Sequence, residues 1–173
     1  MNNTLSQSEI SYPSECLRGI PSDISIEEAE KIDRKIFRFT ENKERPEELG
    51  KYKEMSVTWN DSDEAVRIIS QQQSERRDGF QFPLGFVVIK RSTLDILKRD
   101  EAVKLRYERY PIEGNEYHGN ILISSEATKT VRRQAAAELA HHASVVFRNT
   151  DTGEINITSY EIKNLSSKKV ERT

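Results

Sequence analysis

The chain is poor in cysteine, in aromatic residues and in long apolar runs. It has 173 residues with a single cysteine, Cys16, and 8% of its residues are aromatic. One cysteine excludes an internal disulfide and a zinc site built from several thiolates, and it is typical of a reducing compartment. No apolar run approaches the ~20 residues that a membrane-spanning helix needs. We therefore expect neither a disulfide scaffold nor a membrane protein.

The chain also lacks a strong net charge. It carries 27 basic and 29 acidic residues, which gives a formal net charge of −2, and its pI is near 6.0. A field this weak does not draw a protein onto a phosphate backbone or an anionic membrane, so any nucleic-acid contact has to be local. The first eleven residues are polar and resemble no secretory signal peptide. We expect a cytoplasmic protein.

Length and composition indicate one modest domain. A chain of this length suits a single core, and the hydrophobic fraction of 35% against 32% charged residues predicts unpacked segments. We expect a flexible leader at 1–14, a core domain at 15–148, and a polar tail or edge hairpin at 149–173. The expected fold class is α+β, with a mixed or mostly antiparallel sheet packed by helices.

Apolar periodicity predicts the elements of that domain. Met55, Val57 and Trp59 alternate with polar residues as in a strand, and Ser25 with Glu28 forms the pattern of a helix capping box. By the same reasoning we expect strands at 37–39, 55–59, 84–89, 103–107 and 121–123, and helices at 26–36, 65–69, 92–97 and 127–143. The strand at 84–89 is apolar throughout, which predicts that it is covered on both faces.

The segment from Pro111 to Asn120 predicts a shaped loop and a candidate site. Its proline, glycines and asparagines favour turns, and they surround Tyr117 and one of only three histidines, His118. An imidazole held there, beside tyrosine and arginine, suits a general acid or base, or a phosphate contact. The alternative is that Tyr117 and His118 only anchor the loop. The candidate binding residues are Tyr117, His118, Asn120, Arg106 and Arg109.

Other polar clusters predict structure rather than chemistry. His141 and His142 are adjacent on the long helix, and neighbouring helical residues project about 100° apart, so a surface pair of Glu138 with His142 is expected instead of a metal site. The acids at 61–64 are expected to cap a helix. Cys16 is expected to be buried. The sequence thus indicates no catalytic residue, no metal and no cofactor.

Four basic doublets leave a nucleic-acid function open. With nearby tyrosines they form a groove for single-stranded nucleic acid if they converge, and ordinary solvated faces if they do not. The doublets are Arg76-Arg77, Lys90-Arg91, Lys98-Arg99 and Arg132-Arg133.

Several segments together resemble uncharacterised small bacterial proteins that are found near anti-phage defence or toxin-like genes. The segments are Cys16–Ile20, Ser56–Trp59, Leu84–Ile89, Pro111, Asn115 and His118-Gly119 followed by an alanine-rich helix. The resemblance covers about residues 15–143. It implies a genetic context and carries no chemistry with it.

Three functional hypotheses follow from these observations. The first is a non-enzymatic binding or accessory module that associates with a larger protein partner in a bacterial multi-component system such as anti-phage defence. The second is a small enzyme or toxin that acts on nucleic acid or a nucleotide with His118 as acid or base. The third is a nucleic-acid-binding adaptor that uses the basic doublets. The alternation at 155–162 also suits strand addition to a partner or a second copy.

Overall fold

A computed structural model describes residues 11–42, 45, 51–149, 151, 152 and 155. Most of the expected leader and tail, including 156–162, lies outside the described residues. The described elements are β1 (Glu15–Gly19), α1 (Ile26–Glu30), the 3₁₀ helix η2 (Arg34–Ile36), β2 (Tyr52–Trp59), α3 (Asp63–Gln71), β3 (Gly85–Lys90), α4 (Arg91–Lys98), β4 (Arg106–Arg109), β5 (His118–Ser124), α5 (Lys129–His142) and β6 (Ser144–Phe147).

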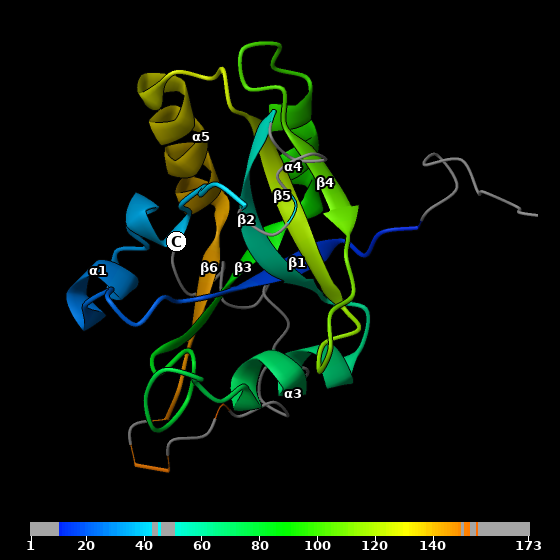
Figure 1. Ribbon diagram of the computed structural model, residues 1–173. Coiled ribbons are helices and arrows are strands. Elements are labelled where there is room, and N and C mark those ends of the chain that lie inside the picture. Colours follow the sequence, from blue (N-terminus) through cyan, green and yellow to red (C-terminus); the bar gives the residue numbers. More distant parts are fainter. Residues whose placement is uncertain (1–10, 43–44, 46–50, 150, 153–154, 156–173) are drawn as a thin grey trace, which may run out of the picture.

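The strands form one sheet of six, in the order β4-β5-β2-β1-β3-β6 (Figure 1). Every neighbouring pair is antiparallel. The expected α+β class and single small domain are therefore confirmed, and the sheet is antiparallel throughout. Among the described residues no helix is long and apolar enough to cross a membrane.

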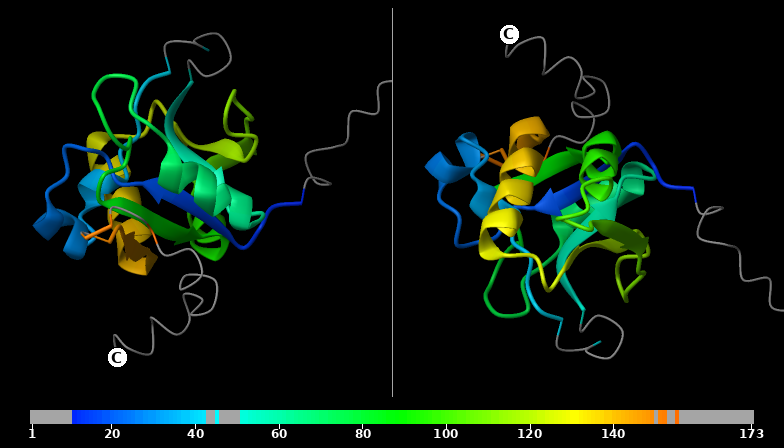
Figure 2. Two further views of the ribbon diagram at one scale, coloured as in Figure 1. Left: turned by 90° about the horizontal axis from the view of Figure 1, so that it is seen from below. Right: turned by 90° about the horizontal axis from the view of Figure 1, so that it is seen from above.

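The sheet has a thickly covered face and a partly open one. Helices α4 and α5 pack on the first face, and α3 lies on the second (Figures 1 and 2). Cys16 and Trp59 point into the first core, whereas Leu17 meets Val66 and Ile69 of α3 in the second. Each large apolar side chain that is fully buried stabilises the fold by roughly 1.5–3 kcal/mol. Strand β3 contributes to both cores, so the prediction of a strand covered on both faces is confirmed.

Local sequence signals explain several element boundaries. Ser25 and Glu28 form the predicted capping box at the start of α1. The hydroxyl of Thr128 caps α5 by accepting from the amide of Val131, which places the helix start after the serines at 124 and 125. Ser124 is the last residue of strand β5 and does not cap α5. These caps satisfy backbone amides that a helix leaves without an internal partner.

One strand prediction is wrong, and two strands of the sheet were missed. Strands β1 and β6 were not foreseen, because β1 carries Arg18 within its short apolar run and β6 follows α5 after Ala143 alone. The expected strand at 37–39 is absent from the described sheet. Phe37 instead ends η2, and beyond it Thr40 forms only an isolated bridge with Glu54.

Two further boundaries shift in ways that affect the candidate site. The strand expected at 103–107 begins at Arg106, because Lys104 takes a positive φ of 49°. Strand β5 begins at His118, so His118, Gly119 and Asn120 pair with β2 and do not belong to a loop. The predicted ten-residue loop is therefore shorter, and its tip is the bridge between Ile112 and Asn115.

Candidate anion-binding cleft

Strands β1 and β2 separate directly after they meet. They pair only at Cys16 with Trp59 and at Leu17 with Thr58. Beyond that point the side chain of Arg18 takes the place of backbone pairing. Its Nη1 donates to the carbonyl of Ser56 at 3.1 Å, and its Nε donates to the carbonyl of Ile36 at 3.2 Å.

Arg18 keeps binding capacity after these two bonds. A guanidinium has five N–H donors, and the remaining donors of Arg18 have no hydrogen-bond partner among the described residues. No described carboxylate forms an ion pair with it either. Burial lowers the pKa of the half-buried Arg18 to about 10, and the nearby Arg38 adds to this shift. A charge in such surroundings favours an anion close by.

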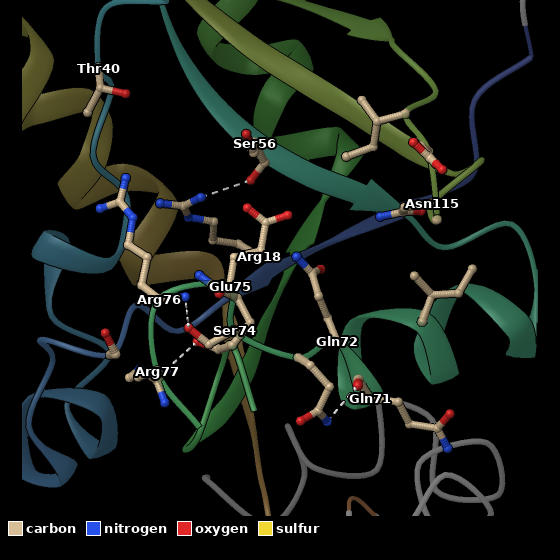
Figure 3. Close-up of a pocket in the computed structure, with 17 residues that line it drawn as sticks. Arg18, Thr40, Ser56, Gln71, Gln72, Ser74, Glu75, Arg76, Arg77 and Asn115 are labelled. Carbon is tan, nitrogen blue, oxygen red and sulfur yellow. Dashed lines mark hydrogen bonds between the residues drawn. The ribbon is translucent and has the colours of Figure 1, made fainter. Parts of the chain in front are cut away.

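This guanidinium lines an open cleft with a volume of about 1200 Å³ on the second face of the sheet. Ser56 of β2 and Arg18 form part of its floor, and the segment after α3 forms a wall (Figure 3). Hydroxyl and carboxamide side chains dominate the remaining lining. They include Ser22, Thr40, Gln71, Gln72, Gln73, Ser74 and Asn115.

The segment after α3, which forms the wall, contributes two further arginines. Arg76 and Arg77 both line the cleft, together with the acids Glu75 and Glu113. Arg77 donates to the carbonyl of Gln81 at 2.9 Å, whereas the exposed guanidinium of Arg76 has no partner in the described part of the chain. The Arg18 and Arg76 side chains both extend toward the Thr40 end of the cleft in Figure 3.

A second hollow of about 410 Å³ continues from the first and shares Arg18, Ser56 and Gln72 with it. Its lining is more apolar and includes Leu17, Val57, Ile69, Phe82 and Ile112. His118 also lines this hollow.

His118 and Tyr117 are fixed by backbone contacts. The Nδ1 of His118 lies 2.7 Å from the carbonyl oxygen of Tyr110. A carbonyl only accepts, so Nδ1 carries the proton and Nε2 of the neutral ring is an acceptor. The carbonyl of Tyr117 accepts from the Trp59 amide at 2.8 Å. The hydroxyl of Tyr117 lies 3.2 Å from the hydroxyl of Ser62. These two contacts hold Tyr117 against Trp59 and Ser62.

Asn120 lies in a separate polar cluster. It is 2% exposed, and its Nδ2 donates to Glu108 at 3.2 Å. The same carboxylate pairs with Arg45 at 2.8 Å, and the guanidinium of Arg45 stacks over the ring of Tyr110 at 3.9 Å. Asn120 is therefore buried beside Glu108 and is not among the described lining residues of the cleft.

The two arginines predicted from the sequence are engaged elsewhere. Arg109 forms two hydrogen bonds with the carboxylate of Asp61, at 2.7 and 2.8 Å, and this partner raises its pKa. Arg106 donates to the hydroxyl of Tyr52 at 3.3 Å. Of the five candidate residues, only His118 is among the described lining residues of these two spaces, and it lines the second hollow rather than the cleft.

The basic doublets do not meet in this cleft. Arg76-Arg77 lines it, whereas the doublets at 90–91, 98–99 and 132–133 are not among its described lining residues. They lie on or beside α4 and α5, which cover the opposite face (Figure 2). Arg91, for example, donates to the carbonyl of Tyr12.

The remaining sequence candidates take structural positions. Glu138 and His142 form the predicted surface pair at 3.4 Å. The described residues contain no group of three or more histidines, cysteines, aspartates or glutamates placed to hold a metal ion. Cys16 is fully buried, as expected, and burial raises the pKa of its thiol, so the thiolate needed for nucleophilic chemistry is disfavoured.

Arg18 and Gln72 were missed by sequence reasoning. The one signal for Arg18 was a charged residue inside the apolar run Cys16–Ile20. Nothing local marks Gln72 within its polar surroundings. Comparison of the chain with protein-family models, curated proteins and solved structures gives no match.

Proposed function

We propose that the protein is a binding module whose cleft receives a phosphate-bearing ligand. The observation that carries this proposal is the half-buried Arg18, which has spare donors and no ion-pair partner among the described residues. Buried charges are ordinarily paired. An anion supplied by a ligand would complete this site.

Phosphate is the anion that fits best. The planar fork of arginine matches phosphate oxygens and forms charge-assisted hydrogen bonds. Arg18 and Arg76 line the cleft from two separate segments and extend toward the same end of it (Figure 3), so they can contact different oxygens of one group. Partial exclusion from solvent strengthens the contact with the half-buried Arg18.

The size of the cleft favours a ligand larger than inorganic phosphate. Small-molecule sites commonly have volumes of about 300–1,000 Å³, and the cleft is of that order, at about 1200 Å³. Its hydroxyl and carboxamide lining suits the uncharged polar part of such a molecule.

The wider expectations from the sequence stay predictions. A larger protein partner, a bacterial defence context, homo-oligomers and a cytoplasmic location belong with the binding-module proposal, in which ligand capture would control an association. The enzyme hypothesis also stays a prediction. His118 lies in the hollow with Nε2 as an acceptor, but its Nδ1 partner is a neutral carbonyl rather than the carboxylate that often orients a catalytic base.

A ³¹P NMR titration with pyrophosphate tests the proposal. Arg76→Gln removes an exposed charge with no described structural partner, and we expect about tenfold weaker binding, which corresponds to the ~1.4 kcal/mol of one charge-assisted contact. Arg67→Gln is the matched control, because Arg67 pairs with Glu64 on α3 and is not among the described lining residues. Absent binding, or equal affinity for all three proteins, would refute the proposal.

A further inference from the structure

The second hollow indicates what accompanies the phosphate. It is continuous with the anion end of the cleft through Arg18, Ser56 and Gln72. Its volume of about 410 Å³ is near the lower end of the ~300–1,000 Å³ typical of ligand sites. A single ligand can thus have its anion among the arginines and a compact second group in this hollow.

The walls of the hollow suit a flat ring. The ring of Phe82 packs directly against Gly19, where a Cβ atom would collide with it. Ile112 adds an aliphatic surface that is 44% exposed, and Ile69 contributes from α3. Aromatic and aliphatic surfaces of this kind favour a planar group that is apolar on its faces.

Two polar groups are available to the edge of such a ring. Gln72 extends toward the middle of the cleft between Arg18 and Asn115 (Figure 3), and its carboxamide has no described partner. A carboxamide offers both donors and an acceptor, and Nε2 of His118 adds an acceptor. A base that binds both side chains needs an N–H donor for Nε2 of His118. It also needs a donor next to an acceptor for the carboxamide of Gln72. Carboxamides read adenine in this manner.

We infer that the ligand is a nucleoside phosphate whose base carries an exocyclic amino group. The base lies in the second hollow, and the phosphate lies beside Arg18 and Arg76. This inference rests on the proposed function, because it assumes that the arginines hold phosphate. It adds the chemical class of the remainder of the ligand and assigns base recognition to Gln72 and His118.

Three small molecules test this inference when their affinities are compared by calorimetry. Adenosine 5′-monophosphate has the amino group, inosine 5′-monophosphate replaces it with a carbonyl, and ribose 5-phosphate lacks the base. We expect the adenosine compound to bind about tenfold more tightly than either other molecule, the effect of roughly one satisfied hydrogen bond to a base. Equal affinities that still fall in Arg76→Gln would overturn the inference and leave the proposed function intact. Absent binding of all three would overturn both.

Two variants locate the recognition. Gln72→Ala changes an exposed side chain, and His118→Phe removes the acceptor while a ring is kept. Each is expected to bring the affinity for the adenosine compound close to that for the inosine compound, with the affinity for ribose 5-phosphate unchanged. A tenfold preference that persists in Gln72→Ala and in His118→Phe would contradict the assignment. Arg67→Gln again serves as the control.

Discussion

The guanidinium of Arg18 donates to the carbonyl of Ser56 across 3.1 Å and so completes β2 where β1 has separated from it. The same side chain closes the end of η2 by donating to Ile36. A single residue therefore holds the floor of the cleft together and presents unused donors to it. Structure and proposed binding are coupled at this position.

Arg18→Met tests the structural half of that coupling. The variant retains an unbranched apolar stem but leaves two carbonyls without donors, so we expect the free energy of unfolding to fall by about 1–3 kcal/mol. Urea denaturation followed by circular dichroism measures it. Arg18→Lys should lose less, because an ammonium can still donate to one carbonyl. Unchanged stability in Arg18→Met would show that the two bonds contribute nothing.

Arg109→Gln distinguishes structural from ligand-binding arginines. The Arg109–Asp61 pair is about 29% exposed on each side, so its loss should cost only about 0.5–1 kcal/mol of stability after solvent screening. We expect pyrophosphate affinity to be unchanged, because Arg109 does not line the described cleft. Asp61→Asn should reproduce the stability loss. A binding defect in Arg109→Gln would restore Arg109 as a ligand contact.

Gly119→Ala should be among the most damaging small substitutions. A Cβ atom there would collide with the indole nitrogen of Trp59 and with the carbonyl of Glu108, which are hydrogen-bonded at 3.1 Å. Overpacking of this kind costs about 2–3 kcal/mol. Gly114→Ala is the comparison, because nothing lies within 4 Å of its added atom and only its positive φ of 80° is strained, at about 1 kcal/mol. Chemical denaturation should rank the two variants in this order.

Tyr107 makes stability depend on alkaline pH. Burial and a hydrogen bond of 2.7 Å to Asp95 raise the pKa of Tyr107 from 10.0 to about 12. The folded protein keeps this proton to higher pH than the unfolded chain, so unfolding releases it and stability falls as pH rises between these values. Tyr107→Phe should show a shallower decline in the free energy of unfolding over that range. An identical slope in the variant would contradict the assignment.

Much of the sheet was readable from local periodicity, whereas the cleft was not. Apolar residues that match the pleat predicted the buried strands that contain Trp59 and the run Leu84–Ile89. Strand β1 was not predicted, because the charged Arg18 interrupts a short apolar run and breaks that spacing. The cleft depends on Arg18, Ser56 and Arg76 meeting across long sequence separations. The proximity of such distant residues follows from the strand order, which no local sequence pattern specifies.

The proposed function requires the anion to contact Arg18. The most direct measurement is the NMR signal of its guanidinium during a pyrophosphate titration, with the Arg109 guanidinium recorded as an internal reference. We predict a saturable shift at Arg18 and none at Arg109, whose donors engage Asp61. A titration that shifts the Arg109 signal and leaves the Arg18 signal unchanged would contradict binding of the anion at Arg18.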